Sequence, residues 1–101
     1  PAQSTRREAA VVFIDLRGFT ALAARMEPEA VMRLLAAYQA RLVPLVRRHG
    51  GVIDKFLGDG IMATFGAVEP RPSYAADALR AVDAVMADVA AWSAHAPDLA
   101  A

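Results

Sequence analysis

Residues 50–66 read GGVIDKFLGDGIMATFG, and this stretch decides the fold. Its paired glycines stop a preceding helix. The apolar residues at 52–53 and 56–57, and then the run at 61–65, predict two strands. The Gly-Asp-Gly sequence at 58–60 suits a tight turn between them. We therefore predict an antiparallel β-hairpin that carries Asp59 in its turn.

Three elements are predicted before the hairpin. Residues 9–14 run apolar without alternation, which predicts a strand that is buried on both faces and ends at Asp15. Residues 19–26 indicate a short helix, and a longer helix follows from Pro28, with apolar residues at steps of three and four. Pro44 lies inside this pattern, and we expect it to kink or shorten the longer helix.

One more helix is predicted after the hairpin. Ser73 is a suitable N-cap, and the helix runs to about residue 93 with an apolar face made of Leu79, Val82, Met86 and Val89. The order strand, helix, helix, strand, strand, helix indicates an α+β fold with a three-stranded sheet. In such a unit a further strand pairs with the first one, so we expect one sheet edge to be unfinished.

The composition indicates one globular domain and limits the classes of partner that we expect for it. The chain has 101 residues, 56% of them hydrophobic, and a formal net charge of +0. We therefore expect neither a nucleic-acid partner nor direct membrane contact, because no overall field favours polyanions and no apolar stretch approaches the roughly 20 residues of a membrane helix. The absence of cysteine fits a cytoplasmic protein.

The two ends of the sequence lead to an expectation about the polypeptide to which it belongs. It starts at Pro1 and ends in an alanine-rich run, which suggests a segment of a longer polypeptide. Within it we expect a core at about residues 8–92 and a tail or linker at 1–7. Membrane attachment through another part of that polypeptide stays open.

Asp15 and Asp59 are the main candidates for chemistry. One stands where a strand ends and the other in the hairpin turn, so pairing of these elements brings both carboxylates to one end of the sheet. Close carboxylates repel each other, and hard Mg²⁺ or Mn²⁺ ions are the usual means of neutralising them. Such a two-metal site suits in-line phosphoryl chemistry. Each aspartate taken alone is more often a turn or cap residue, an alternative that their joint setting weakens.

Residues 17–20 are a second, weaker candidate. Gly18 lets the backbone turn, and the first free N–H groups of the following helix can point at phosphate oxygens. The commoner arrangement, and the alternative here, is a turn glycine followed by a capping residue, Thr20.

These segments resemble one known family. Residues 13–20, FIDLRGFT, are similar to the opening metal-binding segment of the class III adenylyl and guanylyl cyclases. Residues 50–66 are similar to the second metal-binding segment, at the separation usual for that family. The resemblance covers about residues 8–92, the N-terminal half of the catalytic domain, and implies the ferredoxin-like palm sheet that polymerases also use.

The resemblance implies roles for the matching residues. Two metal ions, Mg²⁺ or Mn²⁺, are expected on Asp15 and Asp59, with the Leu16 carbonyl as a further ligand. The triphosphate is expected on the backbone of Gly18, Phe19 and Thr20. The family's C-terminal half, which supplies a second base-reading residue and a transition-state Asn and Arg, has no counterpart here. We therefore expect residues 1–101 alone to be inactive.

Lys55 is the candidate for base recognition. It lies four residues before Asp59, where adenylyl cyclases of this family carry lysine and guanylyl cyclases typically carry glutamate. An ammonium donates to the N1 acceptor of adenine, whereas guanine presents an N1–H donor. Lys55 is also the only lysine among eleven basic residues. The alternative reading is a solvated charge at a strand end.

The preferred interpretation is an adenylate cyclase that converts ATP to cyclic AMP and pyrophosphate in intracellular signalling, with GTP the less favoured substrate. By the resemblance its sites form across a head-to-tail homodimer, so that Asp15 and Lys55 of one chain serve different sites, and an upstream regulatory domain is expected. One alternative is a degenerate module that binds nucleotide or dimerises without turnover, against which the intact Asp15 and Asp59 argue. Another is a ferredoxin-like RNA-binding domain, which the net charge disfavours.

Overall fold

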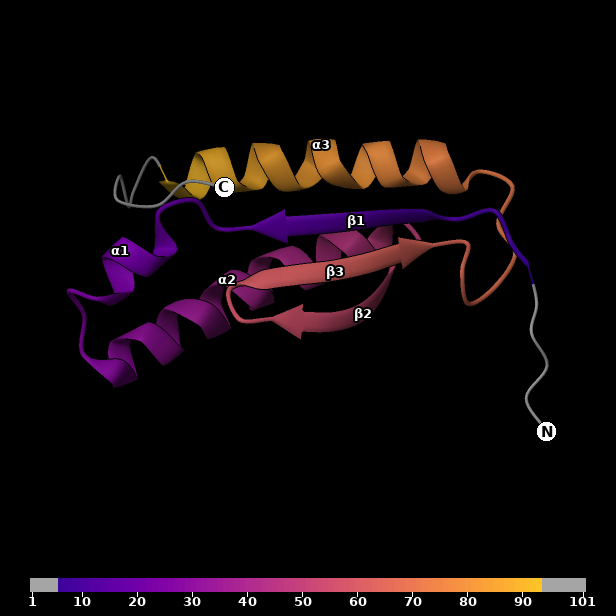
Figure 1. The fold of residues 1–101 in the computed structure, drawn as a ribbon. Coiled ribbons are helices and arrows are strands. Elements are labelled where there is room, and N and C mark those ends of the chain that lie inside the picture. Colours follow the sequence, from indigo (N-terminus) through magenta and orange to yellow (C-terminus); the bar gives the residue numbers. More distant parts are fainter. Residues whose placement is uncertain (1–5, 94–101) are drawn as a thin grey trace.

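The structure, a computed structural model, describes residues 6–93 and confirms the predicted α+β class (Figure 1). The elements follow the expected order of strand, two helices, two strands and helix. They are β1 (Ala10–Asp15), α1 (Phe19–Ala23), α2 (Pro28–Arg48), β2 (Val52–Leu57), β3 (Gly60–Phe65) and α3 (Tyr74–Ser93).

The described strands form one antiparallel sheet in the order β1-β3-β2. β2 and β3 make the predicted hairpin, in which Leu57 pairs with Gly60. Gly58 has φ 61°, and positive φ is confined to glycines in the described chain, so Asp59 has negative φ, as in a type II′ turn. On the other side of β3, the last residue of β1, Asp15, also pairs with Gly60. The hairpin turn therefore lies beside the end of β1.

Both long helices pack on the same face of this sheet and against each other. Figure 1 shows α3 running along β1, with α2 behind β2 and β3. The core between the layers draws from α2, β3 and α3 together. Its most buried members include Tyr38, Leu42, Val46, Ile61, Ala63, Phe65, Val85 and Val89.

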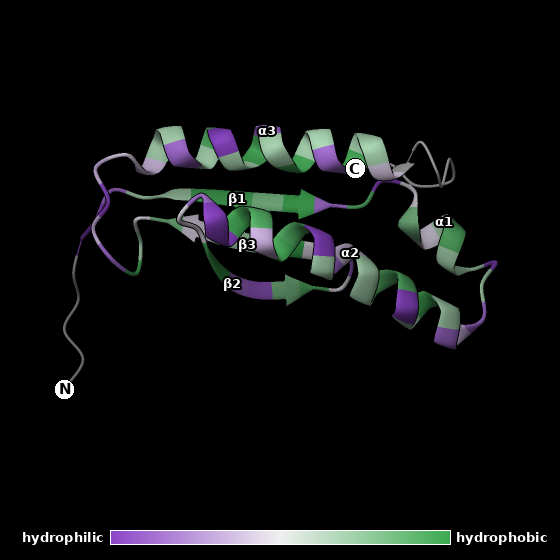
Figure 2. Ribbon diagram, turned by 180° about the vertical axis from the view of Figure 1, so that it is seen from behind, coloured by the Kyte–Doolittle hydropathy of each residue, from purple (hydrophilic) through white to green (hydrophobic). Residues whose placement is uncertain are grey.

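β1 differs from the expected strand buried on both faces. Val11 and Phe13 are 51% and 63% exposed, whereas the residues between and beside them are partly buried. The reason is that the helices cover one face of the sheet only. β1 is hydrophobic up to the aspartate that ends it (Figure 2), so its sequence does not reveal which alternate residues face the helices.

α2 also differs, because Pro44 does not shorten it. The helix continues through Pro44 to Arg48. Tyr38, Leu42 and Val46 form a buried stripe that extends past the proline, while Pro44 itself is exposed. Packing of the last turn against the core thus outweighs the backbone hydrogen bond that proline cannot make.

The buried face of α3 is rotated from the predicted one. Leu79 and Met86 are 67% and 51% exposed, although Val89 is buried as expected. Small residues form most of the true contact face and let α3 approach its neighbours closely; this face consists of Ala78, Ala81, Val85 and Val89. No helix in residues 6–93 combines the length and apolar content needed to cross a membrane.

Asp77 anchors the start of α3. It is 8% exposed and accepts hydrogen bonds from Ser73 Oγ at 2.7 Å and Arg71 Nε at 2.6 Å. Its backbone N–H donates to the Ser73 carbonyl at 2.8 Å, which places Ser73 at the predicted N-cap. The hydrogen bond from Ser73, followed by that from Arg71, lowers the pKa of the Asp77 carboxyl.

We expect Asp77 to make folding stability depend on acid pH. Because its folded pKa lies below the ordinary value, its contribution is complete above about pH 4 and is lost as pH falls through the folded pKa. Asp77→Asn should therefore lower the melting temperature at pH 7, and the difference from the wild type should shrink below pH 4. Thermal denaturation across pH 2.5–7 tests this; a difference that stays constant over that range contradicts it.

Candidate active site

Asp15 and Asp59 lie at the same end of the sheet, as the sequence predicted. The first ends β1 and pairs with Gly60, and the second occupies the adjacent hairpin turn. Beneath them, burial raises the pKa of the Tyr38 hydroxyl, and the negative charges of Asp15 and then Asp59 raise it further. Both carboxylates are therefore close enough to act on one buried group.

Gly60 provides the space in which the Asp15 carboxylate lies. A Cβ atom at this position would overlap Asp15 Oδ1, and it would also lie 3.3 Å from the Ile14 and Leu57 carbonyl oxygens. The φ of Gly60 is not positive, so the turn geometry does not demand glycine here. The sequence suggested only a turn residue at this position, whereas the structure makes it part of the candidate site.

The loop after β1 is fixed by two buried side chains. Leu16 is 3% exposed and Phe19 is 9% exposed, while Arg17, Gly18 and Thr20 face outward. Gly18 has φ 74°, the left-handed conformation that glycine adopts without strain, and α1 begins directly after it. No side chain caps this helix, so the alternative of a capping Thr20 is not borne out. The first N–H groups of α1 are available to a ligand.

Lys55 lies apart from Asp15. It sits on β2 opposite Met62 of β3, two strands from β1 and so about 10 Å across the sheet. Its side chain is 55% exposed and forms an ion pair with Asp54 at 3.4 Å. Lys55, Met62 and Phe13 lie in one row across the sheet, and Asp15 lies two residues further along β1; all four are on the face that α2 and α3 leave open.

The aspartate end offers few oxygen donors, a set that suits a hard divalent cation when other ligands complete its coordination. Within residues 6–93 there is no group of three or more His, Cys, Asp or Glu that could hold a metal ion. Mg²⁺ is commonly held by one or two carboxylates, with water and substrate phosphates as its remaining ligands. Asp15 and Asp59 fit that pattern, and the Leu16 carbonyl lies next to one of them in the chain.

An aromatic stack under the site was not predicted. The rings of Tyr38 and Trp92 are nearly parallel, 13° apart in plane and 6.4 Å apart at their centroids. The Arg41 guanidinium lies 5.3 Å from the Trp92 centroid and is held by Asp88, with Nε to Oδ2 at 2.9 Å. The two residues belong to different helices, so helical spacing alone could not indicate that they meet.

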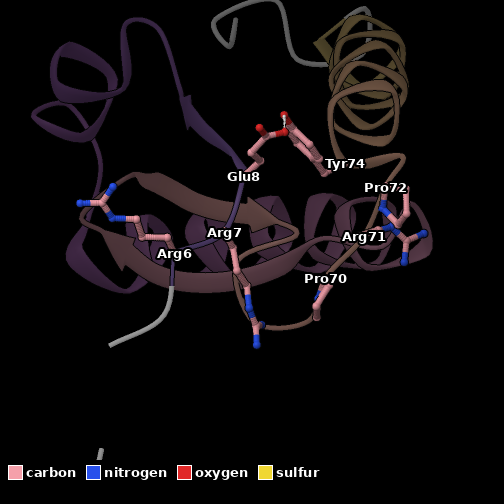
Figure 3. Close-up of a pocket in the computed structure, with 7 residues that line it drawn as sticks. All are labelled: Arg6, Arg7, Glu8, Pro70, Arg71, Pro72 and Tyr74. Atoms are coloured by element: carbon pink, nitrogen blue, oxygen red, sulfur yellow. Dashed lines mark hydrogen bonds between the residues drawn. The ribbon is translucent and has the colours of Figure 1, made fainter. Parts of the chain in front are cut away.

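The opposite end of the sheet holds a cavity of about 510 Å³ (Figure 3). Arg7, which we expected in a tail, donates to the Ala67 carbonyl at 3.3 Å and also contacts that of Val68. Arg6, Arg7 and Arg71 point away from one another in Figure 3. They therefore form no convergent anion site, and the aspartate end stays the better candidate.

Residues 2–95 match the family model described as the adenylate and guanylate cyclase catalytic domain. The chain belongs to this family. It is 44% identical over 64 residues to an adenylate cyclase of Anabaena cylindrica, a match that covers 63% of the chain but 12% of that protein. The likeness to this curated relative is therefore local.

Two solved cyclases support the palm fold. The adenylyl cyclase CyaB from P. aeruginosa has TM-score 0.69 and 34% identity, and the match covers 86% of this chain and 46% of that one. The guanylyl cyclase Cya2 has TM-score 0.64 and 36% identity, with coverages of 84% and 43%. The chain thus spans less than half of either structure. Because the two identities are nearly equal, overall similarity to these cyclases does not distinguish ATP from GTP.

We expect Gly60→Ala to impair metal binding at the candidate site without unfolding the chain. The added methyl group displaces the Asp15 carboxylate, whose flexible end can move while the strand pairing stays intact. Mn²⁺ affinity, followed by electron paramagnetic resonance, should fall at least about tenfold, the order found when a ligand's supporting contacts are lost. The melting temperature should change by only a few degrees. Unchanged Mn²⁺ affinity in a folded variant contradicts the site.

Proposed function

We propose that this chain is the metal-binding part of an adenylate cyclase, which converts ATP to cyclic AMP and pyrophosphate. The observation that carries the proposal is the convergence of Asp15 and Asp59 on the backbone of Gly60, beside a loop whose helix-starting N–H groups are available. A degenerate module without turnover is the alternative, and the retained carboxylate pair disfavours it.

In the proposed reaction the ribose 3′-oxygen forms a bond to the α-phosphorus and its proton passes to solvent. The bond from that phosphorus to the bridging oxygen breaks, and pyrophosphate leaves. Asp15, Asp59 and the Leu16 carbonyl would hold two Mg²⁺ or Mn²⁺ ions, which would supply positive charge to the attacking and leaving oxygens. The backbone N–H groups of Gly18, Phe19 and Thr20 donate to the triphosphate. The buried side chains of Leu16 and Phe19 keep that loop in place, so little reorganisation accompanies binding.

Lys55 is proposed to recognise adenine in a site completed by a second copy of the chain, in a head-to-tail homodimer. Lys55 and Asp15 share the open sheet face but lie on its two outer strands, β2 and β1. That face also exposes large apolar side chains, which a partner copy would cover; they are Val11, Phe13 and Val52. We further propose a cytoplasmic location, where ATP is present, and control by a regulatory domain elsewhere in the full-length protein.

Asp15→Asn and Asp59→Asn should each abolish Mn²⁺-dependent cyclic AMP production by the full-length protein. Each change removes a negative charge and a metal-binding oxygen but keeps the side-chain shape. Because it also relieves repulsion between the carboxylates, folding stability should not fall. Product formation is assayed beside circular dichroism, with Asp83→Asn, an exposed aspartate of α3, as the matched control. Near wild-type turnover in either site variant rules out the two-metal assignment.

Lys55→Glu should shift substrate preference from ATP towards GTP. A carboxylate accepts the N1–H of guanine but cannot donate to N1 of adenine. Sites that hydrogen-bond their substrate discriminate by about 10⁴ or more, so losing one contact should lower kcat/KM for ATP at least about tenfold. Both nucleotides are compared at one Mn²⁺ concentration, with Arg48→Glu as an exposed charge-reversal control. An unchanged ATP to GTP ratio would leave Lys55 as a solvated strand-end charge.

A further inference from the structure

Tyr38 links α2 to the strand that carries Asp15. It is 1% exposed, and its hydroxyl donates a hydrogen bond to the Ile14 carbonyl at 3.3 Å. Ile14 directly precedes Asp15 in β1. The hydroxyl therefore contacts the backbone one residue away from a proposed metal ligand.

The ring of Tyr38 is itself held from both helices. It stacks on Trp92 near the end of α3, and Arg41, one turn further along α2, lies over the same indole. Arg41 in turn forms two hydrogen bonds with Asp88 of α3, at 2.9 Å and 3.2 Å. These contacts limit rotation of the ring, so the position of the hydroxyl is determined by the packing of the two helices.

The electrostatic surroundings keep this hydroxyl a donor. Burial raises its pKa, and the charges of Asp15 and Asp59 raise it further, which favours the protonated phenol that donates this hydrogen bond. A phenylalanine would fill the same volume without placing a polar atom in the core. Hydrogen bonding is therefore what the hydroxyl adds at this position.

We propose that Tyr38 is a positioning residue, which holds the end of β1 so that the Asp15 carboxylate stays over Gly60. The proposal rests on the metal-binding function of Asp15 proposed above. Tyr38 touches neither metal nor nucleotide in this scheme. Tyr38 acts on β1 through the Ile14 carbonyl, and α3 acts on Tyr38 through the Trp92 ring.

The test compares Tyr38→Phe with Tyr74→Phe in the full-length protein. Tyr74 is a matched control, because its hydroxyl donates to Glu8 Oε2 at 3.2 Å at the opposite end of the sheet. Without metal, amide hydrogen exchange in residues 13–16 should be faster in Tyr38→Phe and unchanged in Tyr74→Phe. Mn²⁺ affinity, from electron paramagnetic resonance, should fall about three- to tenfold in Tyr38→Phe only, because this hydrogen bond is long and acts one residue away from the ligand.

Turnover supplies a further readout that simple loss of packing does not change. The Mn²⁺ concentration for half-maximal rate should rise by the same factor, while the rate at saturating Mn²⁺ should change by less than about threefold. Leu42→Val, a core change on the same helix at a fully buried residue, should lower stability without changing Mn²⁺ affinity. Trp92→Leu, which leaves the hydroxyl in place but removes the stacked ring, should weaken Mn²⁺ binding about threefold and carries the test if Tyr38→Phe does not fold.

Asp15→Asn in the same titration separates the two proposals. If it leaves Mn²⁺ affinity unchanged, the metal site is wrong and the role of Tyr38 is wrong with it. If it abolishes binding while Tyr38→Phe and Trp92→Leu bind Mn²⁺ like the wild type, only the positioning role is overturned. Equal loss of affinity in Leu42→Val also overturns that role, because general loosening of the core then explains the effect.

Discussion

The pairing of β1 with β3 is the constraint on which the candidate site depends. It sets Asp15 opposite Gly60 and so brings one carboxylate beside the turn that carries the other. A shift of one residue would turn Asp15 to the helix-facing side and move Val11 and Phe13 into the core. The buried side chains of Ile61, Ala63 and Phe65 oppose that shift, because they require alternate residues of β3 to face the helices.

The same pairing gives the two faces of the sheet different roles. One face packs against α2 and α3 and provides the stability, so the other face can keep charged groups accessible. Apolar side chains that stay in water gain no hydrophobic stabilisation on folding, so the packed face must supply it. Tyr38 joins the two faces, because its ring belongs to the core while its hydroxyl reaches the strand that carries the open face.

The order of the helices and strands could be predicted because the local sequence signals are strong at the hairpin and in α2. The glycines around the hairpin and the helical spacing of α2 identify strands and helix without tertiary information. The proximity of Asp15 and Asp59 could be predicted because a strand end and a hairpin turn meet at one end of the sheet. The face of α3 could not be predicted, since alanines at 78 and 81 carry little signal until α2 lies beside them. The space at Gly60 and the stack of Tyr38 on Trp92 likewise exist only between segments that are far apart in the sequence.

Substrate choice depends on much less of the molecule than metal binding does. Both nucleotides carry the same triphosphate and ribose, so the aspartates and the loop after β1 cannot distinguish them. The base edge is where they differ, and in this chain Lys55 is the proposed contact. Its ion pair with Asp54 is exposed, so exchanging that partner for a base nitrogen costs little, as expected for an exposed ion pair. The proposed preference for ATP therefore requires that water be excluded around Lys55 when the base binds, because an ammonium that stays hydrated gains little from either purine. A surface that covers the open face of the sheet is the part of the assembly that can provide this exclusion, and for that reason dimerisation and specificity are expected to be coupled.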